Sequence, residues 1–276
     1  MAKGAYGCID SVSRNVPQIP LCVDLVSRNT KAGYACVDGV SRKFFGGSIV
    51  GTPLSDYDVG TSVYLNVNGV RTQFVVVHKG LPGTTNYDSS CDGIWLLMKD
   101  IYEKRQWHSS NVVNADISYS ESTIHSYLNS TFLNSLDSGV KSVIKTVKIP
   151  YTVVVRYDAM GEELEVPSVE TSGGSNGLST RIFLLSGVEV GYSGSSLGYE
   201  GNRLDYFSSI SSRIGYYNGT ATGWYLRSPA TDSSGVWIVY KDGNLVMTNA
   251  TVSYGIRPAF VLPSDIQVDS DFNIIA

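Results

Sequence analysis

Three copies of one short motif stand at the start of the chain. Residues 8–14, 22–28 and 36–42 read CIDSVSR, CVDLVSR and CVDGVSR, so Cys, Asp, Val, Ser and Arg recur with a period of 14 residues. A unit of this length is too short for a helical repeat but holds two strands of about five residues and a tight turn. In the third copy, Asp38 followed by Gly39 favours the left-handed dihedrals of a hairpin loop. The repeat therefore predicts three β-hairpins within residues 1–47.

Isolated hairpins are marginal in water, so we expect these to pair with one another or across copies of the chain, which indicates a homo-oligomer. The repeated cysteines raise the alternatives of a metal site or disulfides. Their spacing matches no Cys-x-x-Cys ligand pattern, and Cys91 has no visible partner. We favour the interpretation that each repeat cysteine is a small buried apolar residue.

Composition excludes several classes of protein. The 276 residues include 21 Lys and Arg against 25 Asp and Glu, for a net charge of -4, which argues against a nucleic-acid partner. No apolar run approaches the ~18 residues of a membrane span, and the N-terminus lacks the apolar stretch of a secretory signal. The 18 tyrosines and 28 glycines suit either an adaptable binding surface or a β-rich fold with many turns. Of these two interpretations we favour the second.

Residues 48–276 are predicted to form one α+β domain with a mixed, mostly antiparallel sheet and one or two helices. Strands are expected at residues 63–67, 73–78, 93–98 and 256–262, with hairpin turns at Asn68–Gly69 and Asp242–Gly243. A capping box from Ser118 to Glu121 predicts a helix, which residues 138–139 end. Helical spacing then continues over residues 140–147. The acidic tail after residue 263 is expected to be peripheral.

Two closing motifs carry a resemblance to a known family. Residues 224–229 read WYLRSP and residues 255–260 read GIRPAF. Together with residues 74–79, 126–129 and 183–186, they resemble the signature of an uncharacterised domain family of gut bacteria and their phages, over residues 60–263. That family is similar to the C-type lectin-like fold in its formylglycine-generating-enzyme branch, which includes variable proteins diversified by retroelements. The N-terminal repeats resemble hairpin repeats of phage tail and structural proteins.

Catalytic and metal-binding interpretations are weak. Formylglycine-generating activity needs paired cysteines near the C-terminus, whereas the last cysteine is Cys91. No motif links the three histidines to a nucleophile, and residues 265–271 lack the central glycine of a calcium loop. Glu189, Glu200 and Asp205 could offer the carboxylate pair of a glycan-cleaving enzyme, but acidic residues near loops are usually solvated. We expect no enzyme, no cofactor and no metal.

The remaining candidate is a binding face. In the retroelement-diversified relatives this closing part of the fold carries the variable face, and aromatic rings with neighbouring amides and hydroxyls bind sugars or peptides. We expect Trp224 and Arg227 to be framework residues and Arg257 to form a buried ion pair. The predicted ligand-binding residues are Tyr216, Tyr217, Asn218, Thr220, Thr222, Asp232, Ser233, Trp237, Tyr240, Asn249 and Tyr254.

These resemblances imply a phage virion receptor-binding protein of the tail tip or fibre, made in the host cytoplasm without a signal peptide. Residues 48–276 would bind a host cell-surface protein or glycan, and residues 1–47 would attach to other virion proteins in a homo-oligomer, with a trimer favoured. The alternatives are a structural virion protein (a head decoration or baseplate subunit) and, less favoured, a glycan depolymerase. A nearby imperfect DNA copy of the C-terminal coding segment would indicate a diversity-generating retroelement.

Overall fold

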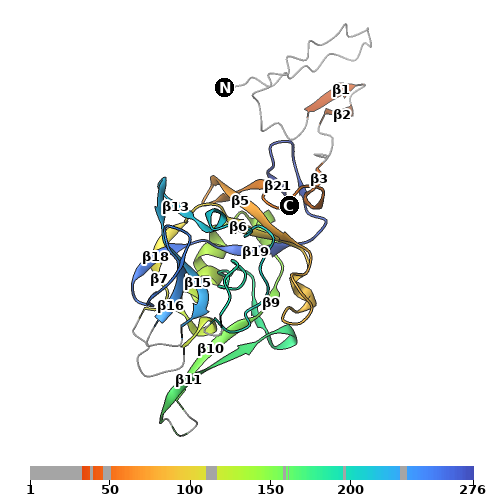
Figure 1. Cartoon of the computed structure of the whole chain (residues 1–276). Coiled ribbons are helices and arrows are strands. Elements are labelled where there is room, and N and C mark those ends of the chain that lie inside the picture. Colours follow the sequence, from red (N-terminus) through yellow and green to blue (C-terminus); the bar gives the residue numbers. More distant parts are fainter. Residues whose placement is uncertain are drawn as a thin grey trace. The chain divides into compact units, whose positions relative to one another are not determined.

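The chain divides into two compact units, residues 1–51 and residues 52–276 (Figure 1). The structure is a computed structural model and describes residues 33–37, 40–45, 51–109, 117–157, 160, 162–194, 197–230 and 235–276. The first two expected hairpins, around residues 8–14 and 22–28, lie outside the described residues.

In the first unit, β1 (Gly33–Val37) pairs antiparallel with β2 (Val40–Phe45). Val37 pairs with Val40, and Cys36 pairs with Ser41. This register is the one that a two-residue loop requires, so the hairpin predicted in the third repeat is confirmed. Asp38 and Gly39 lie outside the described residues.

A four-stranded antiparallel sheet forms part of the core of the second unit. Its order is β19–β6–β5–β4, with the strands β4 (Ser62–Val67), β5 (Val70–Lys79), β6 (Ile94–Met98) and β19 (Ala259–Leu262). The chain passes from β4 to β5 through Asn68 and Gly69, at φ of 51° and 76°, which confirms the predicted turn. Every residue of β6 is buried, as expected from its apolar run.

A five-stranded sheet lies in the order β17–β16–β15–β18–β7. Within these described strands β15 pairs with β18 in parallel, and the other neighbouring strands pair antiparallel. The β16–β17 hairpin turns near Gly243 at φ 84°, as predicted. The strands are β7 (Glu103–Gln106), β15 (Trp224–Pro229), β16 (Gly235–Val239), β17 (Leu245–Asn249) and β18 (Ser253–Ile256).

The single strand predicted over residues 256–262 is wrong, because the chain changes sheet within it. Ile256 pairs with Glu103 in the five-stranded sheet, whereas Ala259 pairs with Leu97 in the four-stranded sheet. Between them, Pro258 has no N–H to continue a ladder. The neighbouring segment also passes from one sheet to the other, because residues 99–102 connect β6 of the four-stranded sheet to β7 of the five-stranded sheet. Two crossings therefore run side by side, joined by hydrogen bonds from Met98 N–H to Pro258 O and from Tyr102 N–H to Ile256 O.

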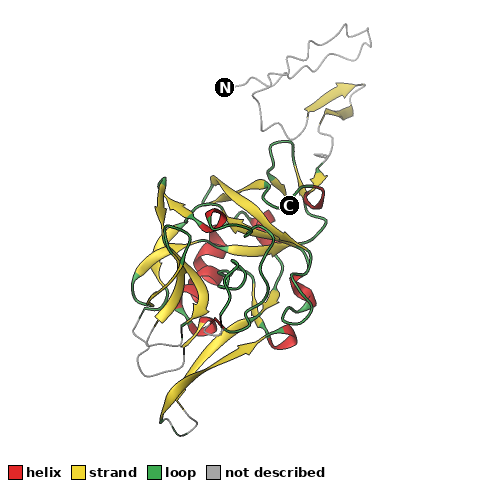
Figure 2. Cartoon of the chain, in the orientation of Figure 1, coloured by secondary structure: helices red, strands yellow, loops and turns green. Residues whose placement is uncertain are grey.

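The helical segment begins later than predicted. Ser122, rather than Ser118, caps it by accepting a hydrogen bond from His125 N–H at 3.1 Å, while Ser118 caps only a preceding turn. Residues 138–139 open a new helix instead of ending the first one, and Val147 lies in a strand. The segments are η3 (Tyr119–Glu121), α1 (Thr123–Tyr127), η4 (Leu128–Phe132), α2 (Leu133–Ser135) and α3 (Ser138–Val143). Figure 2 shows these as short red coils among the strands.

No helix in the described part of the chain has both the length and the apolar character that crossing a bilayer demands.

A long hairpin that the sequence did not predict joins β10 (Tyr151–Tyr157) to β11 (Glu163–Ser172), with β8 (Ile117–Ser118) on the other side of β10. A separate pair consists of β9 (Val147–Ile149) and β12 (Leu178–Thr180). Short single turns punctuate the loops: η1 (Leu54–Asp56), η2 (Ser89–Cys91), η5 (Gly174–Asn176) and η7 (Ser211–Arg213). The coarse prediction of an α+β domain, mainly of sheet, is confirmed.

The acidic tail is integrated into the unit and not peripheral as expected. It forms β20 (Gln267–Val268) and β21 (Ile274–Ile275), and β20 pairs with β3 (Thr52–Pro53). Arg71 holds the tail by donating to Asn273 Oδ1 at 2.9 Å and to Asp271 O at 2.7 Å. The tail thereby closes the unit onto its first strand.

Candidate binding surface

The centre of the candidate surface is a tight hairpin of β13 (Gly215–Tyr217) and β14 (Thr220–Thr222). Tyr217 pairs with Thr220 across a two-residue turn, in which Asn218 and Gly219 have φ of 51° and 77°. Asparagine and glycine are the residues that accept such left-handed angles most readily. These two residues therefore determine the turn, and the polar Asn218 side chain lies at the tip of the hairpin.

Part of the hairpin is exposed. Tyr216 is 42% exposed, and Asn218 and Thr220 are also exposed. Tyr217 is half-buried, with Lys104 Nζ 5.1 Å from the centre of its ring, a cation–π arrangement. Thr222 is half-buried and donates its hydroxyl to Thr220 O. The hairpin thus presents one aromatic ring, one amide and one hydroxyl outward.

Two further predicted residues lie at the base of the hairpin, where Gly223 enters β15. The Tyr254 ring lies so close to Gly223 that a Cβ there would be 3.1 Å from it. Tyr240 follows Val239, which pairs with Trp224, so that Tyr240 lies beside Gly223 in register. Both tyrosines are half-buried against the core. They support the hairpin more than they extend its exposed surface.

The other predicted binding residues do not join this group. Asn249 lies at the opposite end of the sheet, where it pairs with Gly235 and its side chain accepts from Thr251 N–H. Trp237 is half-buried and faces Met247 across the β16–β17 pair. Asp232 and Ser233 lie outside the described residues.

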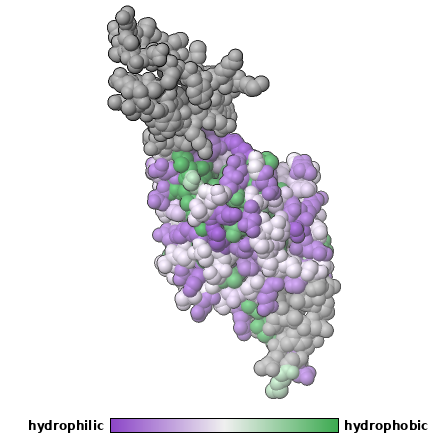
Figure 3. Space-filling view, turned by 180° about the vertical axis from the view of Figure 1, so that it is seen from behind, coloured by the Kyte–Doolittle hydropathy of each residue, from purple (hydrophilic) through white to green (hydrophobic). Residues whose placement is uncertain are grey.

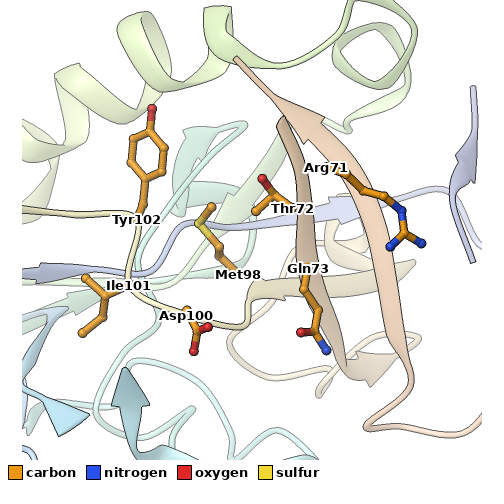
Figure 4. A pocket seen from close by; sticks show the side chains of 7 residues that line it. All are labelled: Arg71, Thr72, Gln73, Met98, Asp100, Ile101 and Tyr102. Carbon is orange, nitrogen blue, oxygen red and sulfur yellow. The ribbon is translucent and has the colours of Figure 1, made fainter. Parts of the chain in front are cut away.

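A pocket of about 280 Å³ lies at the crossing between the sheets. It adjoins the hairpin, because Ile101 N–H donates to Tyr216 O at 2.8 Å. Sequence reasoning missed it, since its residues come from strand ends that have no motif. The lining residues are Arg71, Thr72, Gln73, Met98, Asp100, Ile101 and Tyr102 (Figure 4).

The polar groups of the pocket retain hydrogen-bonding capacity. The Asp100 carboxylate is exposed and makes no hydrogen bond or ion pair within the described residues. The Tyr102 hydroxyl accepts from Asn68 Nδ2 at 3.0 Å and keeps its own proton to donate. Gln73 uses one amide N–H on Ser62 Oγ and keeps its carbonyl oxygen. Figure 4 shows Gln73 and Asp100 ending on the same side of the pocket, with Arg71 turned away.

The buried Arg257 holds the backbone that lines the pocket, and the prediction that it forms an ion pair is wrong. Its Nε donates to Met98 O at 3.1 Å and its Nη2 donates to Lys99 O at 2.9 Å. Burial lowers the pKa of Arg257 to about 10, with Tyr206 and Asp100 partly opposing that shift. Among the described residues no carboxylate lies within ion-pair distance, and Nη1 has no hydrogen-bond partner. The guanidinium therefore acts by holding two carbonyls of the crossing.

The buried ion pair of the domain is formed by Arg227 instead. Its Nη1 and Nη2 lie 2.6 and 2.8 Å from the two carboxylate oxygens of Glu189, and both side chains are fully buried. Burial by itself would lower the pKa of Arg227, but the Glu189 charge outweighs it and the pKa is raised. The prediction that Arg227 and Trp224 are framework residues is confirmed, since both are 0% exposed.

Glu200 is a second carboxylate beside the same guanidinium. It accepts from Thr152 N–H at 2.9 Å and from the Ser228 hydroxyl. Burial raises the pKa of Glu200 to about 7, while the Arg227 charge pulls the other way. Because Glu189 and Glu200 lie in the core and Asp205 lies exposed beside His78 Nδ1 at 2.8 Å, these carboxylates are not gathered in one cleft.

Three other side chains that could take part in chemistry, those of Cys91, His125 and Asp269, are packed against or hydrogen-bonded to neighbouring residues. Cys91 is buried, and burial raises the pKa of its thiol to about 12. His125 packs against the Tyr119 ring, and its Nε2 lies 3.2 Å from Thr180 Oγ1. The Asp269 carboxylate accepts from the backbone N–H of Asp271 and Asn273 in the tail. Within the described ranges, no group of three or more His, Cys, Asp or Glu side chains could hold a metal ion.

Fold and surface together define a mainly β-sheet α+β domain that presents an exposed hairpin and a small polar pocket above a buried ionic framework. Residues 92–264, more than half of the chain, match the family model described as a domain of unknown function, DUF6273, and the chain belongs to this family. The matched region includes both closing motifs, the hairpin and the crossing. No curated protein and no solved structure matches the chain.

Proposed function

We propose that the chain is a receptor-binding protein of a phage virion, located at the tail tip or fibre, and that it attaches to a host cell-surface protein or glycan. The proposal assigns binding to the surface of the β13–β14 hairpin. It also includes a C-type lectin-like fold for the second unit, for which the mainly antiparallel sheets and few helices provide general support.

The observation that carries the proposal is the contrast between the hairpin and its support. Tyr216, Asn218 and Thr220 face solvent, whereas Arg227, Trp224 and Arg257 are buried beneath the same part of the fold. Tyrosine contributes contact area at low entropic cost, and amide and hydroxyl groups add directional hydrogen bonds. Such a surface on a rigid frame suits recognition of a partner.

The N-terminal unit has a separate part in this proposal. Its hairpins would join copies of the chain, with a trimer favoured, and attach them to other virion proteins. Several copies multiply weak contacts by raising the effective concentration of each site, so no single hairpin has to bind tightly.

A second candidate function is that of a structural virion subunit without receptor binding. It is favoured by the edge strand β17, on which Val246 and Met247 are 40% and 41% exposed. Edge strands with exposed apolar side chains are sites of subunit contact. By contrast, most of the face seen in Figure 3 is hydrophilic or near neutral, with small apolar spots.

The test is binding of the purified, fluorescently labelled full chain to intact candidate host cells. We expect saturable binding that the double variant Tyr216→Ala, Thr220→Ala reduces at least tenfold. Tyr199→Ala is the matched control, since Tyr199 is 82% exposed and lies outside the hairpin. Binding that survives the double variant would remove the hairpin from the binding surface, and folded oligomer that binds no host cell would favour the structural subunit.

A further inference from the structure

We propose that the pocket at the crossing between the sheets holds one neutral sugar unit of a glycan. This inference rests on the proposed function and deepens it, because it selects a glycan over a protein as the ligand of the surface. The pocket is joined to the hairpin by the bond from Ile101 N–H to Tyr216 O, so one ligand can touch both.

The size of the pocket limits its occupant. A volume of about 280 Å³ lies just below the ~300–1,000 Å³ of pockets that take drug-sized molecules. A single six-membered ring with its hydroxyl groups fits this space. A folded peptide segment or several bases of a nucleic acid do not.

The lining has the two chemical characters that a sugar ring has. Met98 supplies apolar surface for the C–H groups of a ring, whereas the Ile101 side chain packs toward Gly255 of the neighbouring strand. Asp100 and Gln73 supply acceptor oxygens on one side of the pocket, and Gln73 keeps its second amide N–H as a donor, whereas the Tyr102 hydroxyl points to the opposite side (Figure 4). Vicinal hydroxyl groups both donate and accept, so they match this mixed set.

The charges favour a neutral ligand over an ionic one. Asp100 carries a negative charge at the pocket, and the charge of the buried Arg257 behind it acts in the opposite direction. At the rim, the Arg71 guanidinium is engaged by Asn273, Asp271 and the Tyr64 ring, 3.4 Å from its centre. Neither sign is in excess, so the site lacks a strong pull on a cation or an anion.

The pocket is also fixed in shape before a ligand arrives. Arg257 ties down the carbonyls of Met98 and Lys99, and Lys99 N–H donates to Gln73 O at 3.0 Å. A site held in its bound shape loses less entropy on binding. Weak binding of one sugar unit is therefore sufficient when several copies of the chain act together.

The experiment combines a free-sugar assay with cell binding. Saturation-transfer NMR of the full chain with methyl glycosides of glucose, galactose, mannose, N-acetylglucosamine and N-acetylgalactosamine identifies the bound unit. Asp100→Asn should weaken its binding about tenfold, because a charged acceptor is replaced by a neutral one. Thr72→Tyr, which places a larger strand-forming residue at the pocket, should abolish it. Asp265→Asn, at an exposed carboxylate of the tail, is the matched control and should leave binding unchanged.

Cell binding is measured in parallel, before and after mild periodate oxidation of the cell surface, which cleaves vicinal diols. Loss of cell binding after oxidation and in Asp100→Asn supports the inference. Cell binding that persists in both cases overturns the glycan assignment and leaves the proposed receptor-binding function standing. Sugar binding at Asp100 without any cell binding supports the pocket and contradicts the receptor-binding function. If neither a sugar nor a cell is bound, both proposals fail.

Discussion

The Arg257 guanidinium lies over the Trp224 ring, with Cζ 4.7 Å from the ring centre. Trp224 opens the first closing motif and Arg257 belongs to the second, so this stacking joins the two motifs. Trp224 Nε1 in turn donates to Arg213 O at 2.9 Å, just before the hairpin. One pair of side chains therefore connects the sheet crossing, the pocket and the base of the hairpin.

Arg257→Leu should lower the free energy of unfolding by about 3 kcal/mol, because it leaves the buried carbonyls of Met98 and Lys99 without donors, at ~1–3 kcal/mol each. Urea unfolding measures the change. Arg203→Leu is the control, since Arg203 is exposed and its loss should cost less than ~0.5 kcal/mol. Equal stability of the two variants would contradict the supporting role of Arg257.

The stability of the domain should depend on pH through Glu200. Its native pKa of about 7 lies above the ordinary value of 4.5, so the native state binds an extra proton between these two pH values. The free energy of unfolding therefore falls as the pH rises from about 4.5 to about 7 and then levels off. The full change is on the order of 3 kcal/mol. Urea unfolding at pH 5 and pH 8 measures it.

Glu200→Gln provides the control for this pH dependence. The amide oxygen can still accept from Thr152 N–H but cannot titrate. The difference in stability between pH 5 and pH 8 should shrink in this variant by the share that Glu200 contributes. An unchanged pH dependence would mean that other groups cause it.

Cys91 should not react in the folded protein. Its pKa of about 12, raised by burial, leaves little thiolate at pH 8. Treatment with iodoacetamide followed by peptide mass mapping should find Cys91 unmodified in the native chain and modified in 8 M urea. Native labelling at the unfolded rate would show that the η2 region opens readily.

Asn218→Gly separates the fold of the hairpin from its surface. Glycine accepts the φ of 51° without strain, so thermal stability should change little, while the exposed amide is lost and cell binding should fall. Asn218→Val is the contrasting variant and should destabilise the hairpin by about 1–2 kcal/mol, because a branched residue resists this angle. Normal cell binding by Asn218→Gly would remove the amide from the binding surface.

Local signals in the sequence predicted local structure well. The Asn68–Gly69 and Asp242–Gly243 turns and the buried β6 follow from backbone angles and apolar runs that a few residues determine. The β10–β11 hairpin was missed, because a run such as residues 163–172, with three glutamates and a proline at its centre, resembles a loop until its partner strand is known.

Long-range features of the site were not accessible in the same way. The pocket brings residues 71–73 together with residues 98–102, and no short window contains both. Arg257 was expected to meet a carboxylate because a buried charge usually has a counterion, yet it donates to two carbonyls and stacks on a tryptophan ring, while its Nη1 has no hydrogen-bond partner. The exposure of Tyr216 and Asn218 could be predicted, because adjacent residues, Asn218 and Gly219, determine the turn that exposes them.

The hydrogen bond from Ile101 N–H to Tyr216 O ties the strand that carries Tyr216 to the edge of the pocket. If a glycan fills the pocket with one sugar unit, as we propose, the linkage to the next unit would decide whether that unit can reach the hairpin. On the proposed glycan binding, the domain would discriminate between glycans by the geometry of their linkages. Two surface polymers built from the same sugar but joined through different hydroxyl groups would be told apart by how the second unit meets Tyr216.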